Sequence, residues 1–154
     1  MRYLGIDLGD KRTGLALGDD QTRLATPADV IDIPMGLAGG GPLIEAIVRA
    51  YDRLIGTATP GELVVGLPLN MDGTESRRSK VVRSFAARVQ ARIDREVRFQ
   101  DERLTTAEAD WAMAGADLTH RQKKDRRDAL AAAAILRDFL SAAPGGSSKQ
   151  DPLE

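Results

Sequence analysis

The sequence predicts an α/β domain in which helices cover both faces of a mixed five-stranded sheet. Three strand-like segments follow one another within the first 33 residues, and this pattern is typical of an antiparallel meander. Strand and helix patterns then alternate up to about residue 140, which predicts two parallel strands joined by crossover helices. The 154 residues are enough for one domain of this kind.

The meander is predicted from apolar segments separated by short turns. Residues 3–8 and 13–18 are strand-like, and residues 23–33 form the third segment. Pro27 weakens the middle of that segment, because proline cannot donate to a sheet ladder. Asp7 is unusual in the first strand, where an apolar residue would pack without a desolvation penalty.

The following segments predict a loop, a helix and a central strand. The glycine-rich residues 35–42 (MGLAGGGP) are typical of a flexible loop, and Pro42 suits the first position of a helix. Apolar residues then repeat at helical spacing as far as Ile55. The almost wholly apolar residues 62–68 predict a strand covered on both faces.

The last part of the chain predicts three helices and one strand. Thr74 is expected to cap a helix whose apolar face contains Val82, Phe85 and Val89. The last strand is expected at residues 97–100 (VRFQ). The remaining helices are expected from the capping box of Thr105 and Glu108 to near Gly115, and then up to about Leu140.

Three hairpin-linked strands followed by strand–helix alternation favour a ribonuclease-H-like fold over a fully parallel sheet. We expect a single domain over residues 1–141. The Pro-, Gly- and Ser-rich residues 142–154 are expected to form a disordered tail.

Composition excludes several kinds of site. The chain has no cysteine and a single histidine, so thiolate catalysis and the usual zinc sites are excluded. A bound metal would need oxygen ligands, which favours Mg²⁺ or Mn²⁺. The lack of cysteine and of long apolar segments predicts a cytoplasmic protein without a membrane partner.

Three acids occupy positions that are unusual for an isolated carboxylate. Asp7 lies in the first strand, Glu102 directly follows the last strand, and Asp128 lies on the apolar face of the final helix, within about 60° of arc of Ala132 and Ile135. Each has an ordinary interpretation. Asp7 would cap a turn, and Glu102 would pair with Arg103 or accept from the N–H groups of a helix N-terminus. Asp128 would be neutralised by Arg126 or Arg127. A hard cation held between them is one explanation for all three, because clustered carboxylates repel one another unless a cation neutralises them.

Three further acids lie close to these positions. Asp125 precedes Asp128 by about one helical turn and is either a fourth ligand or a solvent-facing partner of Lys124. Asp72 is an alternative third acid. Asp101 is expected to face away from Glu102 if the strand continues.

Four motifs carry a resemblance to a known family. In order they are GIDLGDKRTGLAL, VVGLPLNMDGTE, DERLTT and DRRDALAAAAIL. They resemble a bacterial family of Holliday-junction-resolvase-like proteins, also described as pre-16S rRNA nucleases, over residues 1 to about 141. The resemblance implies a ribonuclease-H-like fold and Mg²⁺-dependent cleavage of structured nucleic acid, with Asp7, Glu102 and Asp128 in the acidic positions.

Basic residues are clustered although the net charge is −1. Local clusters of this kind bind phosphates even when the whole chain is not basic. A second phosphate candidate is the loop of Asn70, Gly73 and Thr74, expected at a helix N-terminus. The expected phosphate contacts are Arg77, Arg78, Lys80, Arg103, Lys123, Lys124, Arg126 and Arg127.

These observations predict a metal-dependent nuclease, monomeric or homodimeric, that acts first on pre-16S rRNA 5′ ends. Holliday-junction resolution of branched DNA is the first alternative. A non-catalytic RNA-binding ribosome-assembly factor is the second. An ATP-binding module is disfavoured, because the chain has one domain and one phosphate-loop-like segment, DLGDKRTG.

Overall fold

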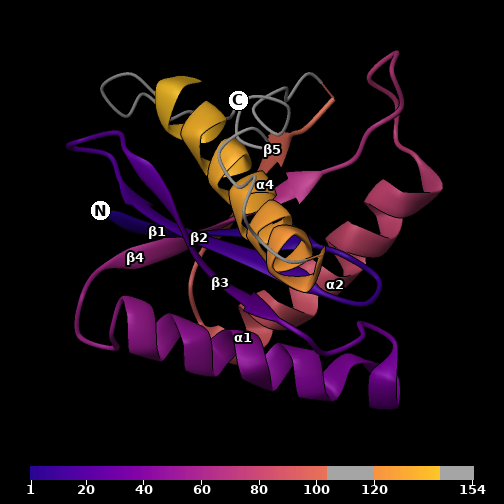
Figure 1. The fold of residues 1–154 in the computed structure, drawn as a ribbon, viewed down its shortest axis with the longest axis horizontal. Helices are drawn as coiled ribbons and strands as arrows, with labels where there is room; N and C mark the ends of the chain where they lie inside the picture. Colours follow the sequence, from indigo (N-terminus) through magenta and orange to yellow (C-terminus); the bar gives the residue numbers. More distant parts are fainter. Residues whose placement is uncertain (104–119, 143–154) are drawn as a thin grey trace.

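The computed structural model describes residues 1–103 and 120–142. They form a five-stranded sheet in the order β3-β2-β1-β4-β5 (Figure 1). β2 is antiparallel to both β1 and β3, whereas β4 is parallel to both β1 and β5, so the predicted mixed sheet is confirmed. The strands are β1 (Arg2–Leu8), β2 (Thr13–Asp19), β3 (Ala25–Ile31), β4 (Gly61–Leu67) and β5 (Val97–Asp101).

Helices cover both faces of this sheet. α1 (Gly41–Leu54) and α2 (Arg77–Ile93) pack on one face, and α4 (His120–Ala142) crosses the other (Figure 1). Leu63 and Val65 of β4 belong to the core under α1 and α2, whereas Val64 belongs to the core under α4. Successive side chains of a strand point to opposite faces, so a strand buried on both is apolar throughout.

Small residues bring α4 close to the sheet. A Cβ atom on Gly5 of β1 would lie 2.9 Å from Leu136 Cβ and 3.1 Å from the Ala132 carbonyl oxygen. Ala132 and Ala133 of α4 are fully buried against the sheet. The alanine-rich face therefore sets the depth at which α4 rests, and with it the position of Asp128.

Two expectations before α1 need correction. The third strand is shorter than residues 23–33, and Pro27 pairs with Ala16 next to an irregularity in the β2–β3 register. The glycine-rich segment is not wholly a loop, since it contains the short 3₁₀ helix η1 (Leu37–Gly40). Pro42 lies in the first turn of α1, as predicted.

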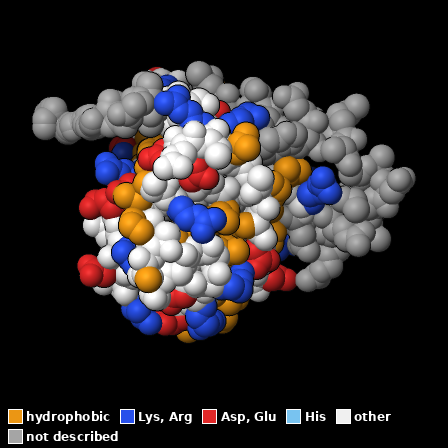
Figure 2. Space-filling view, turned by 90° about the vertical axis from the view of Figure 1, so that its left-hand side faces the viewer, with side chains coloured by type: hydrophobic (Ala, Val, Ile, Leu, Met, Phe, Trp, Pro, Cys, Tyr) orange, Lys and Arg blue, Asp and Glu red, His pale blue; other side chains and the backbone are white. Residues whose placement is uncertain are grey.

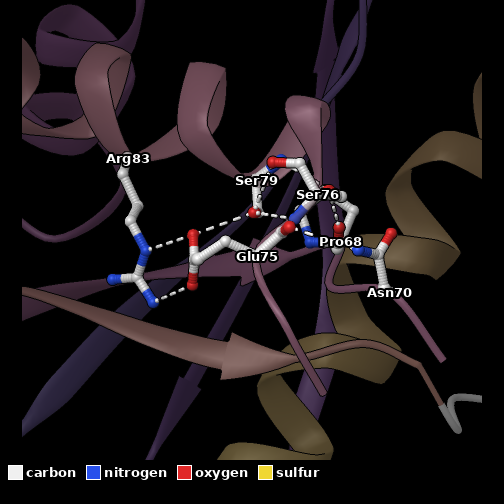
Figure 3. Close-up of polar contacts among 6 residues, drawn as sticks. All are labelled: Pro68, Asn70, Glu75, Ser76, Ser79 and Arg83. Carbon is white, nitrogen blue, oxygen red and sulfur yellow. Dashed lines mark hydrogen bonds and ion pairs between the residues drawn. The ribbon is translucent and has the colours of Figure 1, made fainter. Parts of the chain in front are cut away.

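The N-cap of α2 is Ser76, so the expectation that Thr74 caps this helix is wrong. Ser76 Oγ accepts from the Ser79 N–H at 2.8 Å, and Ser79 Oγ accepts from the Ser76 N–H at 2.8 Å (Figure 3). The two serines form a reciprocal capping box that satisfies backbone donors at the helix start. Ser76 Oγ also donates to the Pro68 carbonyl at 2.5 Å, which ties the cap to the end of β4.

The C-terminal part of the chain is described only in part. The helix expected over residues 105–115 lies outside the described residues, as do residues 143–154 of the expected tail. α4 ends at Ala142, one residue inside that expected tail. In the described part of the chain, no helix combines the length and apolar character needed to span a membrane.

Candidate active site

Asp7 and Glu102 meet at one edge of the sheet. Asp7 is the penultimate residue of β1, and Glu102 directly follows β5. The Glu102 N–H donates to the Leu67 carbonyl at the end of β4, at 3.3 Å. Because β1, β4 and β5 are parallel, their carboxyl ends lie at the same edge, where open α/β sheets place their ligand sites.

The Glu102 side chain extends over the C-terminal end of β4. A Cβ atom on Gly66 would collide with Glu102 Oε2 and would lie 2.5 Å from Ile135 Cδ1. The Glu102 carboxylate therefore lies over the face of β4 that α4 covers. Only glycine leaves room for it there.

The environment of Glu102 disfavours its charge. Burial, followed by the negative charge of Asp7, raises the pKa of Glu102 to about 7, although the Arg78 guanidinium acts in the opposite direction. A carboxyl group with this pKa is partly protonated at neutral pH. Asp7 is therefore close enough to Glu102 for the two negative charges to repel each other.

Asp128 reaches the same side of the sheet from α4. A Cβ atom on Gly14, which pairs with Asp7 across β1 and β2, would collide with the Asp128 carbonyl oxygen. The expectation that Asp128 faces the sheet is confirmed. Its carboxylate is partly exposed, with 30% of the side chain accessible.

The carboxylate of Asp128 forms an ion pair that the sequence did not indicate. Arg12, in the turn between β1 and β2, places Nε 3.0 Å from Asp128 Oδ2, and only 14% of its side chain is exposed. The sequence pointed instead to arginines on the same helix as Asp128. A signal was present in the motif GDKRTG, because this hairpin turn lies beside the acidic edge and carries two cations.

The carboxylates at this edge meet only some of the requirements for binding a hard divalent cation. Asp7 and Glu102 supply oxygen donors and mutual repulsion that a cation would relieve. Among the side chains that the structure describes, those of residues 1–103 and 126–142, no three acidic groups lie close enough together to hold a metal ion. Asp128 is held by Arg12, and the side chain of Asp125 lies outside the described residues.

Two further acids have other partners. Asp101 forms an ion pair with Arg103, which lowers the pKa of Asp101. Arg103 also donates to the Met71 carbonyl at 3.0 Å. Asp72 accepts from the backbone N–H of Thr74 at 3.0 Å and from its hydroxyl at 2.6 Å. Asp72 therefore stabilises its own loop, and Arg103 fastens that loop to the end of β5.

The loop of Asn70, Gly73 and Thr74 is closed by its own hydrogen bonds. The Asn70 N–H donates to the Thr74 carbonyl at 2.9 Å, and the Gly73 N–H donates to the Asn70 carbonyl at 2.8 Å. The loop precedes the N-cap of α2 instead of forming the helix N-terminus. Its role in phosphate binding stays a prediction.

The predicted phosphate contacts lie in different settings. Arg78 forms an ion pair with Asp10 and donates to the Leu8 carbonyl at 2.9 Å, beside the acidic edge. Arg77 and Lys80 are exposed on α2, and Arg126 and Arg127 are exposed on α4. The side chains of Lys123 and Lys124 lie outside the described residues. On the face seen in Figure 2, basic and acidic side chains are interspersed.

Comparison with known proteins identifies a family. The model of the RuvX family, described as Holliday junction resolvase, matches residues 1–142. A relative from Pelotomaculum thermopropionicum is 38% identical over 140 residues, covering 91% of this chain and 86% of its own. A relative from an Anaeromyxobacter species is 41% identical over 140 residues, covering 91% of this chain and 96% of its own. Both relatives are named "Putative pre-16S rRNA nuclease".

Solved structures support the ribonuclease-H-like fold. Thermus thermophilus RuvC matches with a TM-score of 0.52 and 16% identity, covering 92% of this chain and 95% of its own. The same protein in complex with a Holliday junction substrate matches with a TM-score of 0.55 and 13% identity, covering 94% of this chain and 97% of its own. The fold is therefore shared, and the full-length family match together with the two relatives shows that the chain belongs to the RuvX family of Holliday-junction-resolvase-like proteins.

Proposed function

We propose that this protein is a metal-dependent nuclease that cleaves phosphodiester bonds in structured nucleic acid, with 5′-end processing of pre-16S rRNA as its main reaction. The relatives named for pre-16S rRNA cleavage support this substrate. The proposal implies action in the cytoplasm, where rRNA precursors are made. The protein would act as a monomer or a homodimer.

The pairing of Asp7 with Glu102 is the observation that carries this proposal. Two carboxylates at the carboxyl edge of a sheet repel each other, and the raised pKa of Glu102 reports this repulsion together with burial. Such a pair lowers the stability of the fold, so it is expected only where function requires it. A hard cation is the ligand that turns it into a favourable arrangement.

Asp7 and Glu102 would hold Mg²⁺ or Mn²⁺ through their carboxylate oxygens. When bound, the cation supplies a Lewis acid for the phosphodiester and acidifies a water molecule. Glu102 must lose its proton to bind the cation. Asp128 is the third acid of the proposal, and its carboxylate becomes available only when its ion pair with Arg12 opens.

Basic side chains would position the substrate without reading its sequence. Arg78 lies beside the acidic pair and would contact a phosphate close to the scissile bond. The exposed cations of α2 and α4 would contact more distant phosphates. Recognition would then depend on the shape of the nucleic acid, as is usual for structured RNA.

Holliday-junction resolution is the second candidate, because the family description names it. A resolvase cuts two strands symmetrically and therefore acts as a dimer. This candidate predicts cleavage of a four-way DNA junction by a dimeric species. The rRNA candidate does not require a dimer.

The test is a parallel cleavage assay. The purified protein is incubated with a precursor-rRNA leader fragment and with a four-way DNA junction, each with Mg²⁺, with Mn²⁺ and with a chelator. If the rRNA fragment is cleaved only when a divalent cation is present, the main proposal is supported. Cleavage of the junction alone supports the second candidate.

Two variants and one matched control complete the test. Asp7→Asn and Glu102→Gln should abolish cleavage while folding and RNA binding remain. Asp94→Asn makes the same chemical change at the C-cap of α2, where the backbone is left-handed (φ 58°) and asparagine is well tolerated. It should cleave like the wild type. Binding of RNA without cleavage by the wild type under all conditions would favour a non-catalytic ribosome-assembly factor.

A further inference from the structure

A hollow of about 750 Å³ lies next to the acidic edge, between the glycine-rich segment that leads into α1 and the exposed face of α2. Asp10 of the β1–β2 turn, which pairs with Arg78, also lines it. Met35, Gly36 and Gly39 line one side of it, and α2 supplies most of the other. The Met35 N–H donates to the Asp10 carbonyl at 3.0 Å, which holds this segment against the β1–β2 turn. The hollow is therefore built by two elements that are both fastened to the carboxyl end of β1.

A column of side chains on α2 gives the hollow a positive rim. Lys80, Ser84 and Arg88 follow one another at four-residue spacing, so they lie along one face of the helix. The helical rise separates the first from the last by about 12 Å. Lys80 and Arg88 are exposed, and the residues that the structure describes give Arg88 no ion-pair partner. Two cations along one line suit two phosphates of the same strand.

Between these cations the wall of the hollow is apolar. Val81 is 43% exposed, although the helix around it is strongly basic, and Phe85 lies behind it with 5% exposure. Met35 faces them from the other side of the hollow. An apolar surface framed by cations matches a nucleotide, which combines a flat apolar base with a charged phosphate.

Arg78 connects the hollow with the acidic pair. It lines the hollow, donates to the Leu8 carbonyl at the end of β1, and its charge lowers the pKa of Glu102. A strand lying in the hollow would pass this guanidinium before it reaches Asp7 and Glu102. The hollow and the candidate active site are therefore parts of one path along the molecule.

We propose that this hollow binds an unpaired flank of the nucleic acid substrate, with phosphates on Lys80 and Arg88 and a base against Val81 and Met35. The inference rests on the proposed function and adds a substrate class to it: a single-stranded segment beside the cleaved bond. A duplex does not fit this arrangement, because its bases are stacked inside and cannot enter the hollow.

The experiment measures binding without divalent cations, so that it does not depend on cleavage. The probes are a fluorescent single-stranded RNA oligonucleotide and the duplex form of the same sequence. Lys80→Ala combined with Arg88→Ala should weaken binding of the single strand at least tenfold and reduce the slope of log affinity against log salt by about 1.4, as expected for two lost phosphate contacts. Val81→Ser should weaken the single strand but leave duplex binding unchanged.

The matched control combines Arg2→Ala with Arg49→Ala, which removes two exposed cations from β1 and α1, away from the hollow. It should bind the single strand like the wild type. An equal loss in this control, an equal loss for the duplex, or unchanged affinity in the α2 variant would each overturn the inference. Competition by an acidic peptide as strong as by RNA would overturn it as well, because the occupant would then be a protein.

The outcomes also separate this inference from the proposed function. If the wild type cleaves the rRNA fragment but the α2 variant binds the single strand normally, only the hollow is refuted. If the wild type cleaves nothing but the α2 variant loses single-strand binding, the nuclease proposal is refuted and the hollow is supported as an RNA-binding site.

Discussion

Arg12 and Asp128 form an ion pair between the β1–β2 turn and the first half of α4, with Arg12 Nε 3.0 Å from Asp128 Oδ2. A guanidinium thus neutralises a carboxylate that the family resemblance places among the acidic site residues. In this arrangement, Arg12 competes with any cation for Asp128.

This pair leads to the first prediction. Arg12→Met should lower the metal-free free energy of unfolding by about 2 kcal/mol, because it removes the guanidinium that forms an ion pair with a half-buried carboxylate. The same variant should show a larger stabilisation by Mg²⁺ than the wild type, since the competing charge is gone. Thermal unfolding with and without Mg²⁺ measures both effects.

Arg53→Met is the control for Arg12. Its ion pair with Asp29 is exposed, with 56% and 48% of the two side chains accessible, so its removal should change stability little. An Arg12 variant that behaves like this control would contradict the role assigned to the pair.

The pKa of Glu102 leads to the second prediction. The folded protein binds the Glu102 proton more tightly than the unfolded chain does, because the pKa is raised from 4.5 to about 7. The metal-free free energy of unfolding should therefore fall as the pH rises through this range, by at most about 3 kcal/mol. At pH values below 4.5, the pKa of Glu102 in the unfolded chain, this loss of stability is absent.

Glu102→Gln should remove this pH dependence, because the amide does not titrate. At pH 8 without metal, the variant should have a higher free energy of unfolding than the wild type, and at pH 4 the two values should be close. Chemical denaturation at a series of pH values checks this. A variant that is less stable than the wild type at pH 8 would show that the carboxylate is structurally favourable.

Gly66 provides a third prediction that separates stability from function. In Gly66→Ala, the new Cβ meets the ends of two flexible side chains, Glu102 and Ile135, which can move away. We expect a stability loss of about 1 kcal/mol, at the lower end of overpacking effects. Displacement of the Glu102 carboxylate should nevertheless abolish Mg²⁺-induced stabilisation and cleavage. Retained cleavage would mean that the exact position of Glu102 is unimportant.

At Gly14, in contrast to Gly66, we expect an alanine substitution to cause a large loss of stability. In Gly14→Ala, the new Cβ meets the backbone of Asp128, which cannot move unless α4 is lifted from the sheet. We expect a loss of about 3 kcal/mol or a failure to fold. Comparison of the two alanine variants by thermal unfolding shows whether the backbone of α4 is as closely packed as described.

Much of the fold was predictable because it depends on local periodicity. The hairpin-linked strands, the apolar strand β4 and the buried face of α2 all follow from the spacing of apolar residues. The inward direction of Asp128 follows in the same way, from its position relative to Ala132 and Ile135. The cap of α2 was misplaced because Thr74 and Ser76 are both good caps, and only the contact of Ser76 with Pro68 distinguishes them.

The candidate site was predictable only in its residue types. The sequence by itself determined that any metal would be held by oxygen, and it pointed to Asp7, Glu102 and Asp128 as acids in unusual places. The tertiary structure decided which charges meet: Asp7 with Glu102, and Asp128 with Arg12. Periodicity is a property of one segment of backbone, whereas an ion pair or a repulsion depends on how distant segments pack, and that packing sets both the distance and the burial of the charges.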